Sequence, residues 1–186
     1  MVLAIFGPTG VGKTGVAVEL AKLLRNPVAI NCDALQVYED LDVLTGTASA
    51  REQEVLPHEL LGIVPVTEDF SIHEYMPLAH AAIDGALATG RTPIVVGGTG
   101  LYLRAALADL SLRKVPAFDG ESELWSGVTR HPTRIFGLDM DRERLYERID
   151  ARVDAIVAGG GEEEARRASS SPPPETIAST RASIRS

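Results

Sequence analysis

The chain has 186 residues, 45% of them hydrophobic and 24% charged, which suits one globular domain, or one domain and a tail, with enough apolar material for a core. The formal net charge of −8 argues against binding to nucleic acid by bulk attraction, although it says nothing against a local basic patch. A single cysteine, Cys32, excludes an intrachain disulfide, and no apolar run approaches the roughly 20 residues of a membrane helix, so we expect a cytoplasmic protein without membrane contact.

The first part of the chain alternates between strand and helix patterns. Val2 to Phe6 is a continuous apolar run, typical of a buried parallel strand, and residues 13 to 24 carry apolar side chains at helical spacing. Residues 28 to 30 predict a second buried strand. Residues 34 to 58 show little periodicity, and residues 60 to 64 predict a short strand.

The same alternation continues further along the chain. Ser71 and Glu74 have the spacing of a capping box, which predicts a helix that begins there and ends at Gly90. Residues 93 to 96 form a third buried-strand pattern. Residues 101 to 107 favour a helix after it.

The last part of the chain is less regular. Residues 109 to 132 hold prolines and charges with little periodicity, and we expect a short loop. A strand is predicted from 133 to 140, then a helix from 141 to 157 with Asp141 as its N-cap. Residues 169 to 186 begin with serines and prolines and predict a disordered tail, which leaves residues 1 to 168 as the folded core.

This alternation predicts an α/β fold of the P-loop NTPase type, with a parallel sheet and helices on both faces. Ligands of such sheets bind at the carboxyl ends of the strands. Three signals fall at these ends: a glycine-rich loop at 7 to 14, Asp33, and the segment from 97 to 102. We therefore expect one site that all three share.

The loop between the first strand and the first helix is a Walker A motif, Gly7-Pro8-Thr9-Gly10-Val11-Gly12-Lys13-Thr14. Its glycines let the backbone wrap around phosphates, and main-chain amides point inward at the helix N-terminus. Lys13 supplies a positive charge to phosphate oxygens, and the Thr14 hydroxyl is suited to bind Mg²⁺. The motif therefore indicates a polyphosphate ligand.

The other candidates leave alternatives open. Asp33 is suited to hold Mg²⁺ through water or to act as a base, or it caps a turn. Thr99 offers a hydroxyl near the same site, within what is equally a tight strand-to-helix connection. Arg148 and Arg152 share a helix face, where they either clamp phosphate or face solvent.

Five blocks, in this order, make the chain similar to the tRNA dimethylallyltransferase family. They are spread over most of the span from residue 2 to residue 165. The first is the Walker A loop, and the others are Asp33-Ala34-Leu35-Gln36-Val37-Tyr38, Pro57-His58-Glu59-Leu60-Leu61, Val96-Gly97-Gly98-Thr99-Gly100-Leu101-Tyr102 and Arg144-Leu145-Tyr146-Glu147-Arg148-Ile149-Asp150-Ala151-Arg152-Val153-Asp154.

The resemblance implies transfer of a dimethylallyl group from its diphosphate to N6 of an adenine beside the tRNA anticodon, with Mg²⁺ as cofactor. It also implies a nucleotide-binding loop of the ATP-binding type, which here holds the diphosphate. Asp33 would be the general base, and Thr14 and Arg152 would complete the catalytic set. The residues implied to face the nucleic acid are Asp33, Ala34, Leu35, Gln36 and Thr99.

The chain also departs from that family. Full-length relatives carry a helical insert after the region of residues 107 to 111 that grips tRNA, and residues 112 to 132 are too short for it. Relatives also continue past the helix at 141 to 158, where this chain has its Ser/Pro-rich segment. Both differences remove tRNA contacts and spare the diphosphate site.

Three other functions therefore stay open. One is prenylation of a free adenine nucleotide, namely AMP, ADP or ATP. Another is an inactive remnant that still binds diphosphate or ATP. The third, a small-molecule P-loop kinase, is disfavoured by the blocks at 33 to 38 and 99 to 102.

Overall fold

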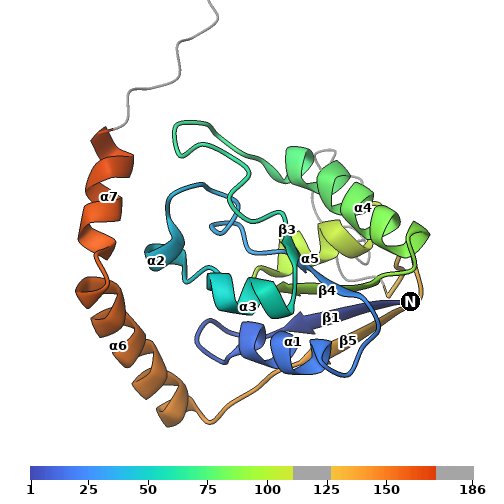
Figure 1. The fold of residues 1–186 in the computed structure, drawn as a ribbon, viewed down its shortest axis with the longest axis horizontal. Coiled ribbons are helices and arrows are strands. Elements are labelled where there is room, and N and C mark those ends of the chain that lie inside the picture. Colours follow the sequence, from blue (N-terminus) through green and yellow to red (C-terminus); the bar gives the residue numbers. More distant parts are fainter. Residues whose placement is uncertain (111–126, 171–186) are drawn as a thin grey trace, which may run out of the picture.

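The computed structural model describes residues 1–110 and 127–170. Within them, a five-stranded sheet with the order β3-β2-β4-β1-β5 forms the centre of the molecule, and every strand pair is parallel (Figure 1). The strands are β1 Val2–Phe6, β2 Pro27–Asn31, β3 His58–Glu59, β4 Thr92–Gly97 and β5 Thr133–Gly137. The predicted α/β fold with a parallel sheet is confirmed.

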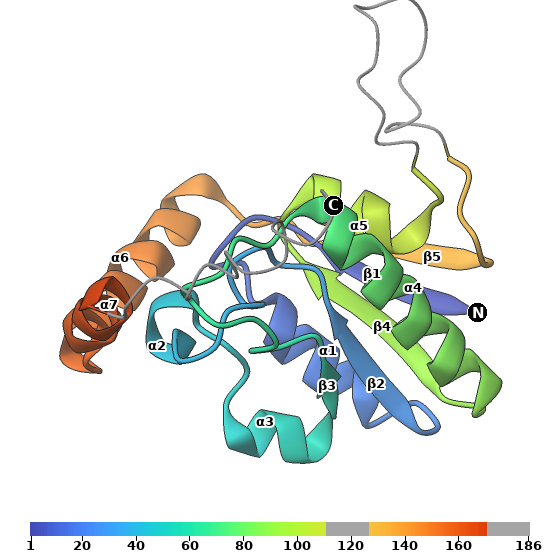
Figure 2. The ribbon, with the colours of Figure 1, turned by 90° about the horizontal axis from the view of Figure 1, so that it is seen from above.

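Helices cover both faces of this sheet (Figure 2). One face carries α1 (Lys13–Ala21) and α3 (Ala50–Val55), and the other carries α4 (Ile72–Ala88) and α5 (Gly100–Leu107). A short helix, α2, spans Asp42–Thr45. The last two helices, α6 (Arg142–Ala158) and α7 (Gly161–Ser170), lie apart from the sheet, beyond the carboxyl ends of its strands (Figures 1 and 2).

The apolar strand runs serve two separate cores. Along β1, Val2 and Ala4 belong to the core under α4 and α5, whereas Leu3 and Ile5 belong to the core under α1. All four side chains are at most 6% exposed. Both faces of the strand are therefore buried, which explains why its sequence is continuously apolar instead of alternating.

The region from 34 to 58 contains the helices α2 and α3, which its periodicity does not predict. For α3, a local signal was available, since Ser49 and Glu52 form a capping box. The Ser49 amide donates to Glu52 Oε2 at 2.8 Å, and the Glu52 amide donates to Ser49 Oγ at 3.4 Å. α2 carries no such signal.

The strand predicted at 60 to 64 is wrong, because the short strand β3 lies just before it. Leu60 and Gly62 have φ angles of 65° and 53°, and this left-handed backbone interrupts an extended chain. Val64 instead forms an isolated parallel bridge with Tyr38.

The helix caps predicted from sequence are confirmed, and a further unpredicted helix, α7, follows α6. Ser71 donates its amide and its hydroxyl to Glu74 Oε2, both at 2.7 Å, and Asp141 Oδ1 accepts from the second and third amides of α6. The unpredicted helix α7 includes Ser169 and Ser170, so the predicted start of the tail is wrong by two residues. The rest of that tail and most of the predicted loop, residues 171–186 and 111–126, lie outside the described residues.

Among residues 1–110 and 127–170, no helix combines the length and apolarity needed to cross a membrane.

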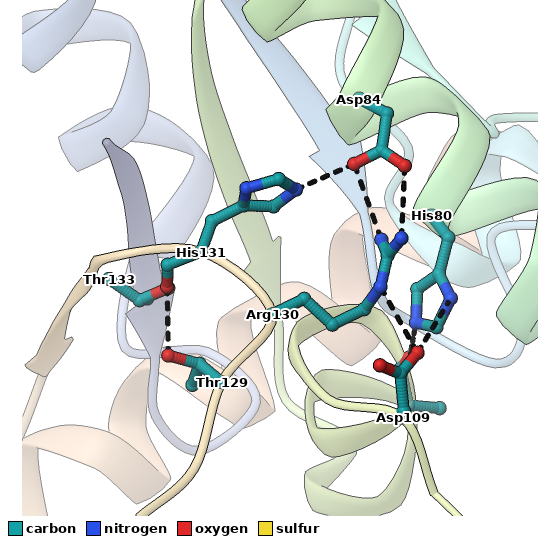
Figure 3. A network of polar contacts seen from close by, with 8 residues as sticks. His80, Asp84, Asp109, Thr129, Arg130, His131 and Thr133 are labelled. Carbon is teal, nitrogen blue, oxygen red and sulfur yellow. Dashed lines mark hydrogen bonds and ion pairs between the residues drawn. The ribbon is translucent and has the colours of Figure 1, made fainter.

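A polar network joins α4, the end of α5 and the segment before β5 (Figure 3). Asp84 accepts from Arg130 Nη2 at 3.0 Å and lies 2.6 Å from His131 Nε2. Arg130 also pairs with Asp109 at 3.1 Å, and His80 lies 3.7 Å from the same carboxylate. The hydrogen bonds from Arg130, followed by the one from His131, lower the pKa of Asp84. This network fastens the entry to the last strand at the opposite end of the sheet from the Walker A loop.

We expect Asp84→Asn to lower the free energy of unfolding by about 1 kcal/mol at most, because the carboxylate is nearly half exposed and solvent screens its ion pairs. The pKa of Asp84 is lowered in the folded state. Asp84 therefore makes its full contribution to the free energy of unfolding above the ordinary Asp pKa of about 4, and this contribution is lost as pH falls through the lower pKa of the folded state. Urea unfolding at pH 7 and pH 3 should therefore show a difference from wild type that shrinks in acid. The exposed Asp69→Asn is the matched control, and an equal effect of both variants would contradict the expectation.

Candidate active site

Three loops meet because the strands that precede them end level in the sheet. Phe6 at the end of β1 pairs with Gly97 at the end of β4, and Asn31 at the end of β2 pairs with Val96. The Cys32 amide extends this pairing by donating to Val96 O at 2.9 Å. The Walker A loop, the segment after Asn31 and the segment after Gly97 therefore share one edge of the sheet, as predicted.

Two backbone approaches at this edge require glycine. A Cβ at Gly97 would lie 2.5 Å from both the carbonyl oxygen and Sγ of Cys32, and a Cβ at Gly7 would lie 2.6 Å from Leu138 O. Real Cβ atoms do not come this close to backbone, so any larger residue would push the strand ends apart.

The Walker A loop presents unsatisfied amides to its interior. Gly12 is the N-cap of α1 and has φ 98°, a left-handed conformation that glycine adopts without strain. Gly12 has no side chain to cap α1, and the first turn of the helix holds no acidic residue. The loop therefore directs free N–H groups and the positive end of the helix dipole toward a bound anion.

Lys13 lies over the mouth of this loop. Its ammonium group donates to Gly7 O and Pro8 O, both at 3.0 Å, and a Cβ at Gly98 would lie 3.2 Å from Nζ. Burial lowers the pKa of Lys13, while the nearby Asp33 carboxylate raises it. The structure thus brings the Lys13 cation next to the Asp33 anion and the end of β4.

A buried framework fixes the Asp33 turn. The Asp33 amide donates to Asn31 Oδ1 at 3.0 Å, and Asp33 Oδ1 accepts from the Leu35 amide at 3.0 Å. Asn31 is only 2% exposed, and its carbonyl accepts from Tyr75 Oη at 2.7 Å. Among the described residues, Asp33 Oδ2 has no hydrogen-bond partner and stays available to a ligand. The sequence analysis missed Asn31 and Tyr75, although a polar residue closing a buried strand was a usable signal.

Helix α6 brings two arginines to the loop from outside the sheet. Ile149 packs on Gly10, where a Cβ would lie 3.1 Å from Cγ1 of Ile149. Arg148 lies against Gly12, with Nη2 3.4 Å from the position of a Cβ there. Arg152 donates from Nη2 to Thr45 O at 2.7 Å and lies within electrostatic range of Lys13. Both arginines thus lie near the loop, with Arg152 half-buried and Arg148 exposed, so the phosphate-clamp alternative stays a prediction.

The remaining predicted residues come from three segments at this edge. Thr14 is the second residue of α1, and Thr99 is the N-cap of α5. Both are half-buried, and among the described residues their hydroxyls have no hydrogen-bond partner. Gln36 turns toward α2, where Nε2 donates to Thr45 O at 3.3 Å, beside Arg152. Ala34 packs against the core under α4, and Leu35 is 60% exposed. Asp33 and Gln36 therefore face the site, whereas Ala34 does not.

A Walker A loop at the edge of a parallel sheet, with a carboxylate and two arginines around it, defines the class of P-loop α/β proteins and has groups suited to a polyphosphate. The family model described as IPP transferase matches residues 36–126 and 117–183, and the model described as Isopentenyl transferase matches residues 1–66. The chain belongs to the IPP transferase family.

Individual relatives agree with this placement. A tRNA dimethylallyltransferase of Salinispora arenicola is 47% identical over 106 residues, which are 57% of this chain and 31% of that protein. One from Anoxybacillus flavithermus is 31% identical over 84% of this chain and 67% of the relative. The crystal structure of the full-length tRNA isopentenylpyrophosphate transferase from Bacillus halodurans superposes with a TM-score of 0.80 at 28% identity, covering 94% of this chain and 71% of that one. The matches thus span about a third to two-thirds of the length of these curated relatives.

We expect Lys13→Ala to weaken binding of Mg²⁺–diphosphate at least about tenfold, or about 1.4 kcal/mol, because the variant removes the cation at the mouth of the loop. Isothermal titration calorimetry with inorganic diphosphate measures this directly. Lys22→Ala is the matched control, since Lys22 is the C-cap of the same helix and pairs with Glu19 at 2.6 Å. Unchanged affinity in a folded Lys13→Ala chain would refute the assignment of the loop.

Proposed function

We propose that the chain transfers a dimethylallyl group from dimethylallyl diphosphate to N6 of an adenine, in tRNA next to the anticodon. The observation that carries this proposal is the neighbourhood of Lys13, Asp33 and Arg152 at the edge of the sheet, where two cations and one carboxylate surround a phosphate-binding loop. Membership of the IPP transferase family supports the same reaction, and so do its relatives, which are named as tRNA dimethylallyltransferases.

The arrangement suits substitution at an allylic carbon. The bond between C1 of the dimethylallyl group and its diphosphate oxygen breaks, and a bond from N6 of the adenine to C1 forms. Negative charge develops on the leaving diphosphate, where the loop amides, Lys13 and Arg152 stabilise it. The proton lost from N6 passes to Asp33, whose Oδ2 has no partner among the described residues.

The donor set fits a magnesium ion. Mg²⁺ prefers hard oxygen ligands and keeps several waters, and the Thr14 hydroxyl and the Asp33 carboxylate are oxygen groups without full hydrogen bonding among the described residues. Thr14 would bind the ion directly and Asp33 through water. Bound there with the diphosphate, Mg²⁺ would neutralise part of the leaving-group charge.

A free adenine nucleotide is the second candidate acceptor. The IPP transferase model matches this chain in two pieces that meet at residues 117–126, and the alignment with the A. flavithermus relative runs over 208 positions while using only 84% of the 186 residues. That relative therefore contains internal residues that this chain lacks. With fewer residues, this chain has less surface for a large acceptor than the longer relatives have. A small acceptor is therefore favoured more in this chain than in those relatives. An inactive remnant would bind diphosphate and transfer nothing to either acceptor.

We expect Asp33→Asn to cut prenyl transfer by roughly 10²- to 10⁴-fold while leaving diphosphate affinity nearly unchanged, because the amide keeps the shape of the carboxylate but does not accept the proton. Single-turnover assays give the transfer rate, and calorimetry gives the affinity. Asp40→Asn is the matched control, since Asp40 is exposed and its φ of 58° suits asparagine equally well. If affinity and rate fall together, Asp33 acts mainly through the metal.

The acceptor can be identified by incubating the chain with dimethylallyl diphosphate, Mg²⁺ and either tRNA or AMP, followed by mass analysis of the adenine. We expect weak tRNA modification. Added salt should lower the affinity for tRNA more than it lowers the rate of the chemical step, because contacts with the tRNA phosphate backbone carry the salt dependence. Efficient tRNA modification at physiological salt would contradict this expectation. Transfer to AMP alone would favour the nucleotide acceptor, and no transfer beside normal diphosphate binding would favour the remnant.

A further inference from the structure

Helix α6 carries Arg148 and Arg152 but has little packing of its own. None of its residues is buried, and its inner side chains Leu145 and Ile149 are only half-buried where they meet Gly10. The helix also lies outside the two cores of the sheet (Figure 2). Apolar burial alone therefore does not determine where its arginines point, and specific polar contacts must contribute.

One such contact is a carboxylate from α7 at the beginning of α2. Glu164 accepts from the Val43 amide through Oε1 and from the Leu44 amide through Oε2, both at 2.9 Å. α2 has no side-chain cap of its own, because its N-cap residue is Leu41. The two charge-assisted hydrogen bonds join segments about 120 residues apart and satisfy amides that the short helix leaves open.

The other end of α2 contacts Arg152. Thr45, the last residue of α2, accepts from Arg152 Nη2 at 2.7 Å. Gly46 follows, and a Cβ there would lie 2.7 Å from the same nitrogen, so the guanidinium rests directly on the backbone. α2 thus lies between two contacts, with Glu164 at its start and Arg152 at its end.

We infer that Glu164 is a positioning residue: by capping α2 it holds the Thr45 carbonyl where that carbonyl orients the Arg152 guanidinium toward the phosphate loop. The inference rests on the proposed function, in which Arg152 contacts the diphosphate. Glu164 itself acts from the far side of α2, where it lines a surface hollow with Asp40, Asp42 and Val66. Its effect on the ligand passes through Arg152.

The test measures binding of Mg²⁺ and inorganic diphosphate to the full chain by calorimetry. Glu164→Gln should weaken affinity about tenfold, the size expected for lost hydrogen bonds to a charged group. Glu163→Gln is the matched control, because it removes the same charge from the same helix and Glu163 pairs only with Arg166 and Arg167 among the described residues. It should bind like wild type.

A double-mutant cycle separates positioning from a general structural role. In an Arg152→Ala background, Glu164→Gln should cause no further loss of affinity, because the group that it positions is gone. Additive losses would overturn the inference. Glu164→Asp keeps the charge but does not reach both amides, so its affinity should fall between those of wild type and Glu164→Gln. Wild-type affinity in Glu164→Asp would overturn the inference as well, since net charge alone would then suffice.

Amide hydrogen exchange distinguishes the failure of this inference from failure of the proposed function. Glu164→Gln should speed exchange at Val43 and Leu44, with the melting temperature as a check on the fold. Faster exchange with unchanged diphosphate affinity would overturn the positioning role and leave the proposed function intact. If Arg152→Ala binds diphosphate like wild type, the assigned role of Arg152 falls and the inference falls with it, whatever the exchange shows.

Discussion

The candidate site depends on how closely the ends of neighbouring strands approach one another. Gly97 and Gly7 permit contacts of 2.5 and 2.6 Å between would-be Cβ positions and neighbouring backbone, which no other residue tolerates. The approach of Gly97 to Cys32 brings the ends of β4 and β2 together, and the approach of Gly7 to Leu138 holds the Walker A loop against the segment after β5. Lys13 and Asp33 thereby become electrostatic neighbours although 20 residues separate them in the chain. The placement of these two side chains therefore depends on the close approach of the backbone at the strand ends.

The charges around the loop come from two parts of the molecule that are held in different ways. Lys13 and Asp33 are fixed by the sheet and by buried groups such as Asn31, which is 2% exposed. Arg148 and Arg152 come from α6, which buries no residue and contacts the rest of the molecule through the half-buried Leu145 and Ile149 and through the hydrogen bond from Arg152 to Thr45 O. A diphosphate that touches both parts would join them, and its binding energy would add to the stability of the α6 arrangement. The same dependence means that contacts far from the ligand, such as those at α2, influence how strongly it binds.

The sequence predicted the parts of the fold whose signals are local. A continuous apolar run, a glycine-rich loop and helical spacing identified β1, the Walker A loop and α1, and capping patterns located the starts of α4 and α6. It missed α3 although a local capping box was present, and it missed α2, whose start depends on a distant partner. α2 has four residues and no periodicity, and its start is capped by Glu164 from the far end of the chain, while left-handed backbone at Leu60 rules out the strand predicted there. For the site, spacing put both arginines on one helix face, but the direction of that face depends on two non-local contacts, the packing of Ile149 on Gly10 and the hydrogen bond from Arg152 to Thr45 O.

The two substrates of the proposed reaction make unequal demands on a chain of this length. The groups suited to the donor lie in short blocks around Lys13, Asp33 and Arg152, and the fold brings them together without help from the residues that longer relatives add. An acceptor such as tRNA is instead bound through many weak backbone contacts spread over a large surface, each of which adds to affinity and to salt dependence. A net charge of −8 opposes such binding unless the cations are concentrated at the site, as they are on the inner face of α6. In the proposed reaction, a smaller acceptor surface would remove binding that substrate and transition state share, so it would raise the acceptor KM and leave the rate of the chemical step unchanged.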